Sequence, residues 1–283
     1  MCIVKTTEER VRRTINRNKM LLENDRIAVA VSGGKDSAVL LEVLSRIERD
    51  FPGAEIVPFT IDEGIRGYRD EALKAARKLV DSLGMSLEVR SFKDLYGVTL
   101  DEIVSSRNEK GLGACSYCGV LRRRAMNDVA RGLHTDVVAT GHNLDDEAQT
   151  VVMNVMRGDG RRIARMNRSR SEALEGFVPR VKPLSDLSER DIVAYAYHMG
   201  LPYHDIPCPY SNEAFRNDLR VFLNQMEYKR PGTLFAVMHS AEGIAELLQK
   251  GTELDKTGTC ERCGAPTAST ICKTCEMLDD LRE

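Results

Sequence analysis

The sequence lacks a long hydrophobic run, an apolar leader and an overall excess of positive charge. Because it contains no stretch of about 18 consecutive apolar residues, it predicts no membrane-spanning helix and no association with a membrane. The first residues, MCIVKTTEERVRR, have no apolar core of the kind that directs secretion, so we expect a cytoplasmic protein. The formal net charge of -2 excludes a protein that coats nucleic acid through a uniformly basic surface.

Positive charge is nevertheless concentrated in three short runs. They are RVRRTINRNK at 10–19, RRR at 122–124 and RGDGRRIARMNRSR at 157–170. Local patches of this kind can bind a phosphate backbone even when the total charge is close to neutral. The alternative for each run is a solvated helix face, which for any single run is at least as good an explanation.

Apolar and helical patterns alternate along most of the chain. Four apolar runs are typical of buried parallel strands: 26–31, 55–61, 86–92 and 136–140. Helical patterns lie between them, at 39–50, at 68–84 and near 118–131. This alternation predicts the α/β class, with a doubly wound parallel sheet that binds ligands at the carboxyl ends of its strands.

The 283 residues are enough for one large domain with a small appendage. Thr6 and Glu9 fit a capping box, which predicts a first helix running to about Leu22. We expect an N-terminal helix region over 1–24 and a catalytic domain over 25–250, helical across 188–250. A linker at 251–259 leads to a small C-terminal module over 258–283.

The stretch SGGKDS at 32–37 has the composition of a phosphate-binding turn between a strand and a helix. Gly33 and Gly34 let the backbone approach an anion closely, and Lys35 adds a positive charge. Ser32 and Ser37 supply hydroxyl groups. The turn is shorter than a Walker A loop, so it suits a pyrophosphate group better than a whole triphosphate. The alternative is an ordinary tight turn between a strand and a helix.

Eight cysteines occur, at positions 2, 115, 118, 208, 260, 263, 272 and 275. Without an export signal, metal or redox chemistry explains them better than a disulfide framework. Cys115, Cys118 and Cys208 could ligate an iron–sulfur cluster with one iron left open. They could instead form a persulfide and disulfide relay, be structurally inert, or join Cys2 in a four-thiolate zinc site.

The last four cysteines follow the pattern C-x2-C-x8-C-x2-C, which is typical of a structural zinc site. They are Cys260, Cys263, Cys272 and Cys275. So small a module could hardly fold without its metal. A redox role is the alternative. The module could bind RNA or brace a dimer, and the sequence does not choose between these roles.

The stretch GHNLDDEAQT at 141–150 follows the predicted strand 136–140 and so belongs to the ligand-binding edge of the sheet. Gly141 would allow a nucleotide to approach, and Asp145 or Asp146 could orient Mg²⁺ or accept a proton. Alternatively, Asn143 or Asp145 caps a helix running to Met156. Among the five histidines only one, His142, could face the nucleotide, and we expect structural or exposed positions for His134, His198, His204 and His239.

The motifs SGGKDS, CSYCG, GHNLDDEAQT and CPYS occur in this order, spaced over almost the whole chain. In these motifs the sequence resembles the tRNA 2-thiolation enzymes of the TtcA/TtuA family, which are N-type PP-loop ATP pyrophosphatases, and most of all the group of archaeal NcsA. The resemblance implies a sulfurtransferase that adenylates the 2-oxygen of a tRNA uridine. Sulfur then displaces AMP and leaves 2-thiouridine, with the wobble uridine as the expected target.

The resemblance also implies roles for particular residues. Cys115, Cys118 and Cys208 would bind a [4Fe-4S] cluster whose open iron takes up hydrosulfide. Asp146 would be the catalytic carboxylate, and Asp36 would help to place Mg²⁺. Arg122 stands where relatives carry a lysine near the ATP phosphates, a change that keeps the charge but alters geometry and acidity. Binding of ATP would involve Ala30, Ser32, Gly33, Gly34, Lys35, Asp36, Ser37, Ile61, Arg122 and Gly141.

The expected partners are tRNA, a second copy of the chain, and either free sulfide or a ubiquitin-like thiocarboxylate protein as the sulfur donor. Relatives carry an N-terminal zinc finger that only Cys2 matches, so Cys2 is not expected to hold structural zinc. Three alternative functions stay open: thiolation of the T-loop uridine, a PP-loop amidating or lysidine-type ligase, and a non-catalytic zinc-dependent RNA-binding protein.

Overall fold

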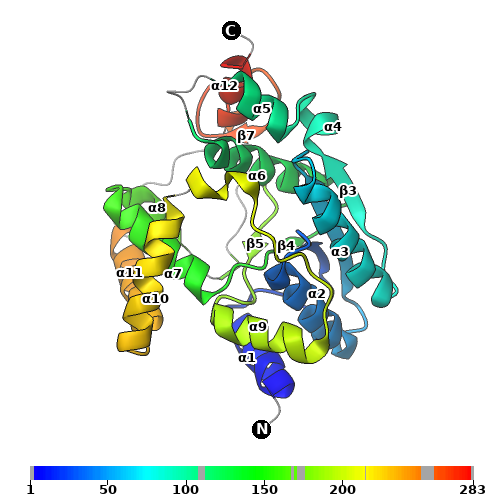
Figure 1. Cartoon of the computed structure of the whole chain (residues 1–283), viewed down its shortest axis with the longest axis vertical. Helices are drawn as coiled ribbons and strands as arrows, with labels where there is room; N and C mark the ends of the chain where they lie inside the picture. The colour runs from blue at the N-terminus through cyan, green and yellow to red at the C-terminus, as the bar shows by residue number, and fades with distance from the viewer. Residues whose placement is uncertain are drawn as a thin grey trace.

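A computed structural model describes residues 3–107, 112–166, 169–170, 176–213, 215–249 and 258–281. A parallel sheet occupies the middle of the molecule, with helices on both of its faces (Figure 1). The N-terminal helix and the C-terminal module lie at opposite ends of the long axis (Figure 1). Cys2 and the linker residues 251–257 lie outside the described residues.

The sheet has five strands in the order β3-β2-β1-β4-β5, and all of its pairs are parallel. The strands are β1 (Arg26–Ala30), β2 (Glu55–Asp62), β3 (Glu88–Ser91), β4 (Val137–Ala139) and β5 (Arg180–Val181). The chain moves outward in one direction through β2 and β3, then crosses back to β4 on the other side of β1. This is the predicted doubly wound sheet, and its strand order reverses between β1 and β4, where such sheets bind ligands.

Twelve α-helices and two short 3₁₀ segments are found among the described residues. The first part of the chain forms α1 (Ile3–Arg17), α2 (Lys35–Ile47), η1 (Glu48–Asp50), α3 (Tyr68–Ser82), α4 (Phe92–Tyr96), α5 (Leu100–Ser106) and α6 (Ala114–Gly132). The second part forms α7 (Leu144–Met156), α8 (Gly160–Ala164), α9 (Glu189–Met199), η2 (Pro209–Glu213), α10 (Arg216–Lys229), α11 (Thr233–Gln249) and α12 (Lys273–Asp279). A small antiparallel pair, β6 (Gly258–Thr259) and β7 (Pro266–Thr267), precedes α12.

The apolar strands are buried on both faces, as the continuous apolar runs predict. Ile27 and Val29 of β1 pack into one cluster with α1, α2 and α9. The residue between them, Ala28, faces the other cluster, which α5 and α6 cover. This alternation follows from the two-residue repeat of a strand. A third cluster joins α7, α10 and α11 at one side of the molecule (Figure 1).

The first helix differs from its prediction at both ends. It is already formed at Ile3, so Thr6 lies inside the helix and not at its cap, and it ends at Arg17, before Leu22. Lys19 adopts a left-handed conformation, with φ of 47°. The N–H groups of Lys19 and Met20 bond back to the carbonyls of Asn16 and Ile15, a Schellman motif that closes the helix without glycine.

The structure also contains elements that the sequence did not predict. The predicted strand 86–92 ends at Ser91, because the Ser91 hydroxyl accepts a bond from the N–H of Asp94 and starts α4. The strand β5 is only two residues long, and α5 and α8 are also short.

No helix of the described residues is long and apolar enough to cross a membrane.

Candidate functional site

The SGGKDS turn connects β1 to α2 and is folded by its own serines. The Ser37 hydroxyl lies 3.1 Å from both the N–H and the hydroxyl of Ser32, and it donates to the carbonyl of Gly34 at 2.9 Å. Gly33 has φ of 90°, and its carbonyl accepts the backbone N–H of His204 at 2.8 Å. The turn therefore presents the first N–H groups of α2 and the positive end of its dipole at the carboxyl edge of the sheet.

The loop after β4 packs directly on this turn. A side-chain carbon at Gly141 would lie 3.0 Å from the backbone of Asp36 and Ser37, so any larger residue would push the two loops apart by a few tenths of an ångström. The Asn143 side-chain amide donates to Asp36 at 2.8 Å and accepts the N–H of Asp146 at 2.9 Å. Asn143 thus caps α7, as the capping alternative predicted, and also joins the two loops at the point where the strand order reverses.

The charged groups of this edge are arranged in pairs. Lys35 Nζ lies 2.8 Å from Glu189 Oε1 and 3.3 Å from Asp36 Oδ2. Burial lowers the pKa of Lys35, but these two carboxylates outweigh that effect and raise it, so the lysine stays positive. Burial raises the pKa of Asp36, and the adjacent Lys35 partly offsets the increase.

The two adjacent aspartates of the GHNLDDEAQT stretch have different environments. Asp145 is buried, and its carboxylate accepts the N–H of Glu189 at 2.8 Å at the start of α9, which favours a structural role for it. Asp146 is partly exposed and lies 3.3 Å from Arg216 of α10. Burial raises the pKa of Asp146, and Arg216 opposes this increase. His142 points its Nδ1 at the Thr140 hydroxyl, 2.9 Å away.

Folding brings the three cysteines of the predicted cluster site to one region. Cys115 and Cys118 lie in the first turns of α6, and Cys208 directly precedes η2. The Cys115 thiol lies 3.7 Å from the backbone carbonyl of Tyr210 in η2. Cys118 and Cys208 belong to the same apolar cluster, and burial raises the pKa of the Cys118 thiol to about 11.

These three thiols are spaced more widely than the ligands of a single metal ion. Among the described residues, only the four C-terminal cysteines form a group of three or more metal-type ligands within 4.8 Å of one another. An iron–sulfur cluster is larger than one ion, so its thiolates sit further apart than those of a zinc site. The arrangement therefore fits a cluster better than one zinc ion held by these three cysteines.

A chain of charged side chains connects the nucleotide turn with the helix that carries Cys115 and Cys118. Arg69 of α3 donates to the carbonyls of Ser32 at 2.7 Å and Ile61 at 2.9 Å. It also pairs with Glu63 at 2.9 Å, and Glu63 pairs with Arg122 of α6 at 3.6 Å. Arg69 and Glu63 are both buried.

Sequence reasoning missed several residues of this edge. Glu63 directly follows β2, so its position after a strand could have indicated it. Arg69 and Arg216 belong to ordinary amphipathic helices and carry no signal of their own. His204, expected to be structural or exposed, holds the Gly33 carbonyl through its backbone and stacks edge-on against Tyr68, with ring centroids 5.5 Å apart.

The remaining predicted nucleotide contacts lie at the same edge. Ala30 ends β1, next to the turn, and Ile61 lies near the end of β2 with its side chain buried. Arg122 is about half exposed, with 47% of its side chain accessible, and projects from α6 toward Glu63. The structure thus brings the predicted ATP-binding residues to the carboxyl ends of β1, β2 and β4 and to the facing side of α6.

The four C-terminal cysteines have the geometry of a zinc site. The Sγ atoms of Cys260 and Cys275 are 4.0 Å apart, and those of Cys263 and Cys272 are 3.7 Å apart. Zinc–sulfur bonds of about 2.3 Å in a tetrahedron would place sulfur atoms about 3.8 Å apart. The module packs on the helix that carries the other cysteine pair, because Met277 of α12 lies in the cluster under α6.

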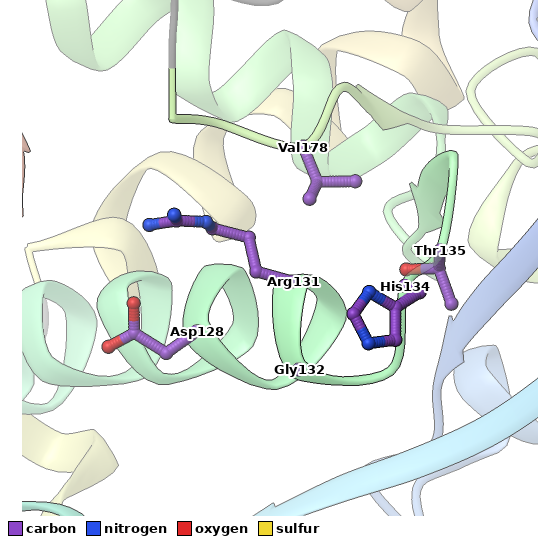
Figure 2. A pocket seen from close by; sticks show the side chains of 6 residues that line it. All are labelled: Asp128, Arg131, Gly132, His134, Thr135 and Val178. Carbon is purple, nitrogen blue, oxygen red and sulfur yellow. The ribbon is translucent and has the colours of Figure 1, made fainter.

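A surface hollow of about 550 Å³ lies at the other end of α6 (Figure 2). Its lining consists of Asp128, Arg131, Gly132, His134, Thr135 and Val178. None of these residues belongs to the predicted nucleotide or cysteine sites. His134 lies here because it closes α6 in a left-handed conformation, with φ of 53°.

The glycine turn, the packed loop after β4 and the parallel sheet define the class of PP-loop nucleotide-binding domains. A family model described as a PP-loop domain matches residues 4–227. The chain is 40% identical to the cytoplasmic tRNA 2-thiolation protein 1 of Drosophila willistoni, over 99% of this chain and 81% of that one. Its identity to the protein of the same name from Aspergillus niger is 38%, over 100% of this chain and 82% of that one.

The chain therefore belongs to the PP-loop family and, within it, to the family of the cytoplasmic tRNA 2-thiolation protein 1. A solved structure is also similar: the U34-tRNA thiolase NcsA from Methanococcus maripaludis, described with its [4Fe-4S] cluster. The two chains superimpose with a TM-score of 0.85 and 35% identity, covering 99% of this chain and 88% of NcsA.

Proposed function

We propose that this protein is an ATP-dependent tRNA uridine 2-sulfurtransferase that acts in the cytoplasm. It would convert a uridine of tRNA to 2-thiouridine and ATP to AMP and pyrophosphate. The tRNA 2-thiolation relatives and the U34-tRNA thiolase NcsA support this activity and favour the wobble uridine as the target.

One observation carries the proposal: the nucleotide turn and the cysteine region lie at the same edge of the sheet and are connected. Arg69 holds the Ser32 carbonyl, Glu63 pairs with Arg69, and Arg122 pairs with Glu63 on the helix of the cysteines. A reaction that first activates an oxygen and then replaces it with sulfur needs both centres within reach of one pyrimidine ring.

In the first step the uridine 2-oxygen attacks the α-phosphorus of ATP, and the bond to the β-phosphate breaks. The N–H groups at the start of α2 and the Lys35 ammonium would hold the leaving pyrophosphate. Asp36 and Asp146, which Asn143 holds at the contact of the two loops, would hold Mg²⁺ on the phosphates. Arg122 would place its guanidinium near the phosphates from the side of α6.

In the second step sulfur attacks carbon 2 of the activated ring, the carbon–oxygen bond breaks, and AMP leaves. Cys115, Cys118 and Cys208 would hold a [4Fe-4S] cluster, which supplies a sulfur atom to this carbon when it is bound. Of these thiols, Cys118 is buried, Cys208 is partly buried and Cys115 is exposed. The sulfur would come from free sulfide or from a thiocarboxylate carrier protein, and the enzyme would act as a homodimer.

Anaerobic purification followed by an assay with unmodified tRNA, ATP, Mg²⁺ and sulfide tests the proposal. We expect a brown protein with about four irons per chain, and mass spectrometry of tRNA nucleosides should detect 2-thiouridine together with one AMP per modified base. Sequencing of nuclease fragments should place the modified uridine at position 34, and a modified T-loop would correct the target.

Two cysteine variants and the wild-type protein test the cluster assignment separately from the thiolation activity. Cys115→Ser should lose both the brown colour and thiolation, whereas Cys2→Ser should keep both. A colourless wild-type protein that still thiolates tRNA would overturn the cluster assignment and favour a persulfide route. Failure of the brown wild-type protein to release AMP or form 2-thiouridine would overturn the function itself.

A further inference from the structure

The three basic runs of the sequence differ in how many of their side chains form ion pairs in the folded protein. Three of the four arginines of the first run form ion pairs with acidic residues elsewhere in the chain. These ion pairs are Arg10–Asp191 at 2.6 Å, Arg12–Asp50 at 2.7 Å and Arg17–Asp186 at 2.5 Å. These three arginines therefore stabilise the packing of α1, whereas Arg13 donates to the backbone carbonyl of Glu9.

In the second run, Arg123 differs from its two neighbours, which both form ion pairs. Arg122 pairs with Glu63, and Arg124 pairs with Asp128 at 2.6 Å. Between them, Arg123 makes no hydrogen bond or ion pair within the part of the chain that the structure describes. Its guanidinium lies over Gly119 of the same helix, 3.5 Å from where a side-chain carbon would be. It therefore points toward the end of α6 that carries the cysteines.

A second such arginine lies beside Arg123. The Asn127 side chain bonds to the carbonyl of Gly176 at 3.2 Å and to the N–H of Val178 at 2.9 Å, and so fixes the approach to β5 along α6. Arg123 lies one turn before Asn127, on the same face of α6. Arg180 follows Val178 by two residues and is exposed, and among the described residues its side chain has no hydrogen-bond or ion-pair partner.

The charges of these side chains act on one another. Desolvation and the positive charges of Arg180 and Arg162 lower the pKa of Arg123. Arg162 comes from α8 and the third basic run, and it pairs with its neighbour Asp159 at 3.0 Å. Three elements thus bring like charges together, and among the described residues the side chains of Arg123 and Arg180 have no carboxylate partner. Such an arrangement costs stability unless an anion binds, and arginine is the residue that best matches phosphate oxygens.

We propose that Arg123 and Arg180, with Arg162 beside them, bind the phosphate backbone of the tRNA next to the cysteine centre. This inference rests on the proposed function, because it assigns a binding surface to the same substrate. Arg123 is five residues after Cys118, so a backbone held here would lie beside the sulfur-carrying end of α6. The contacts position the tRNA and carry no base specificity.

The double variant Arg123→Ala/Arg180→Ala tests the surface. Affinity for unmodified tRNA is measured between about 50 and 200 mM salt, the range over which phosphate contacts change affinity strongly. We expect affinity to fall about tenfold and the slope of log affinity against log salt to become about 1.5 units shallower, as for two lost phosphate contacts. Arg123→Lys/Arg180→Lys should keep most of the slope, because the charge is retained.

The matched control is Arg77→Ala/Lys78→Ala, which removes two exposed positive charges from α3. It should change neither the slope nor the affinity. ATP binding and the iron content of every variant confirm that the fold and the cluster are intact. If the wild-type enzyme thiolates tRNA but the arginine variant binds tRNA with unchanged affinity and slope, this inference is wrong and the proposed function stands.

A protein partner would give a different result. If the arginine variant binds tRNA normally and thiolates with free sulfide, but not with a thiocarboxylate carrier protein, the arginines bind the carrier and the inference is overturned. If the wild-type enzyme forms no 2-thiouridine at all, the proposed function fails, whatever the arginine variants show.

Discussion

Replacement of Gly33 by alanine is the sharpest test of the nucleotide turn. Gly33 has φ of 90°, a conformation that costs an L-residue about 1–2 kcal/mol. A side-chain carbon there would also lie 2.1 Å from the carbonyl oxygen of Ala72 in α3, well inside the closest approach of real atoms. The turn or α3 must therefore shift by roughly 1 Å, and a shift of that size near a reacting group can reduce the rate about a hundredfold.

Gly97→Ala is the matched control for this variant. Gly97 also has a left-handed backbone, with φ of 78°, but a side-chain carbon there would meet nothing within 4 Å. It should lose only about 1 kcal/mol of stability from the backbone conformation, a fall of roughly 2–4 °C in melting temperature. Its affinity for ATP and its rate of AMP formation should match those of the wild type.

The assay compares the melting temperature, ATP affinity and AMP formation of Gly33→Ala, Gly97→Ala and the wild type. Gly33→Ala should lose more stability than the control and should lose AMP formation by about two orders of magnitude. If Gly33→Ala formed AMP at the rate of Gly97→Ala, the close packing of the turn on α3 would not matter to the chemistry. The geometric argument for the turn would then be refuted.

Three further perturbations test other parts of the structure. Glu63→Gln would remove the nearer carboxylate partner of the buried Arg69 and leave Asp62, at 3.9 Å, so we expect up to about 3 kcal/mol of lost stability in chemical unfolding, together with slower thiolation. Chelation of zinc, or Cys272→Ser, should unfold the C-terminal module, measured as zinc per chain and protease cleavage, while ATP still binds. Burial and the nearby Asp25 raise the pKa of Glu48 to about 7, so its ionisation destabilises the fold as pH rises from about 4.5 to 7. Glu48→Gln should therefore raise the free energy of unfolding by about 1 kcal/mol at pH 8, after solvent screening, and leave it unchanged at pH 4; an equal effect at both pH values would contradict this assignment.

The alternation of elements was predicted from local patterns, and the doubly wound sheet is confirmed. The runs at 26–31 and 55–61 are buried strands within one residue of their predicted ends. The predicted end of the first helix, at about Leu22, was wrong. The helix ends at Arg17 because Lys19 adopts a left-handed backbone conformation that is usual for glycine. The strand β5 was missed because two residues carry no periodicity.

The candidate site could be predicted only in part. The glycine turn, the cysteine pairs and the GHNLDDEAQT stretch have local spacings that indicate their chemistry, and the roles of their residues remain predictions. The pairing of Arg69 with Glu63 and of Arg216 with Asp146 depends on which helices pack together. Charged residues on amphipathic helices have no spacing that identifies their partner.

By itself the sequence determined four of the five strands of the main sheet, the position of the glycine turn, and which cysteines are close enough along the chain to share a zinc ion. Only the tertiary structure decided how distant segments meet: Cys208 beside α6, Asn143 on Asp36, and Arg180 beside Arg123. The reason is physical, since short-range patterns reflect local geometry and burial, whereas contacts between segments far apart in the sequence depend on how the whole core packs.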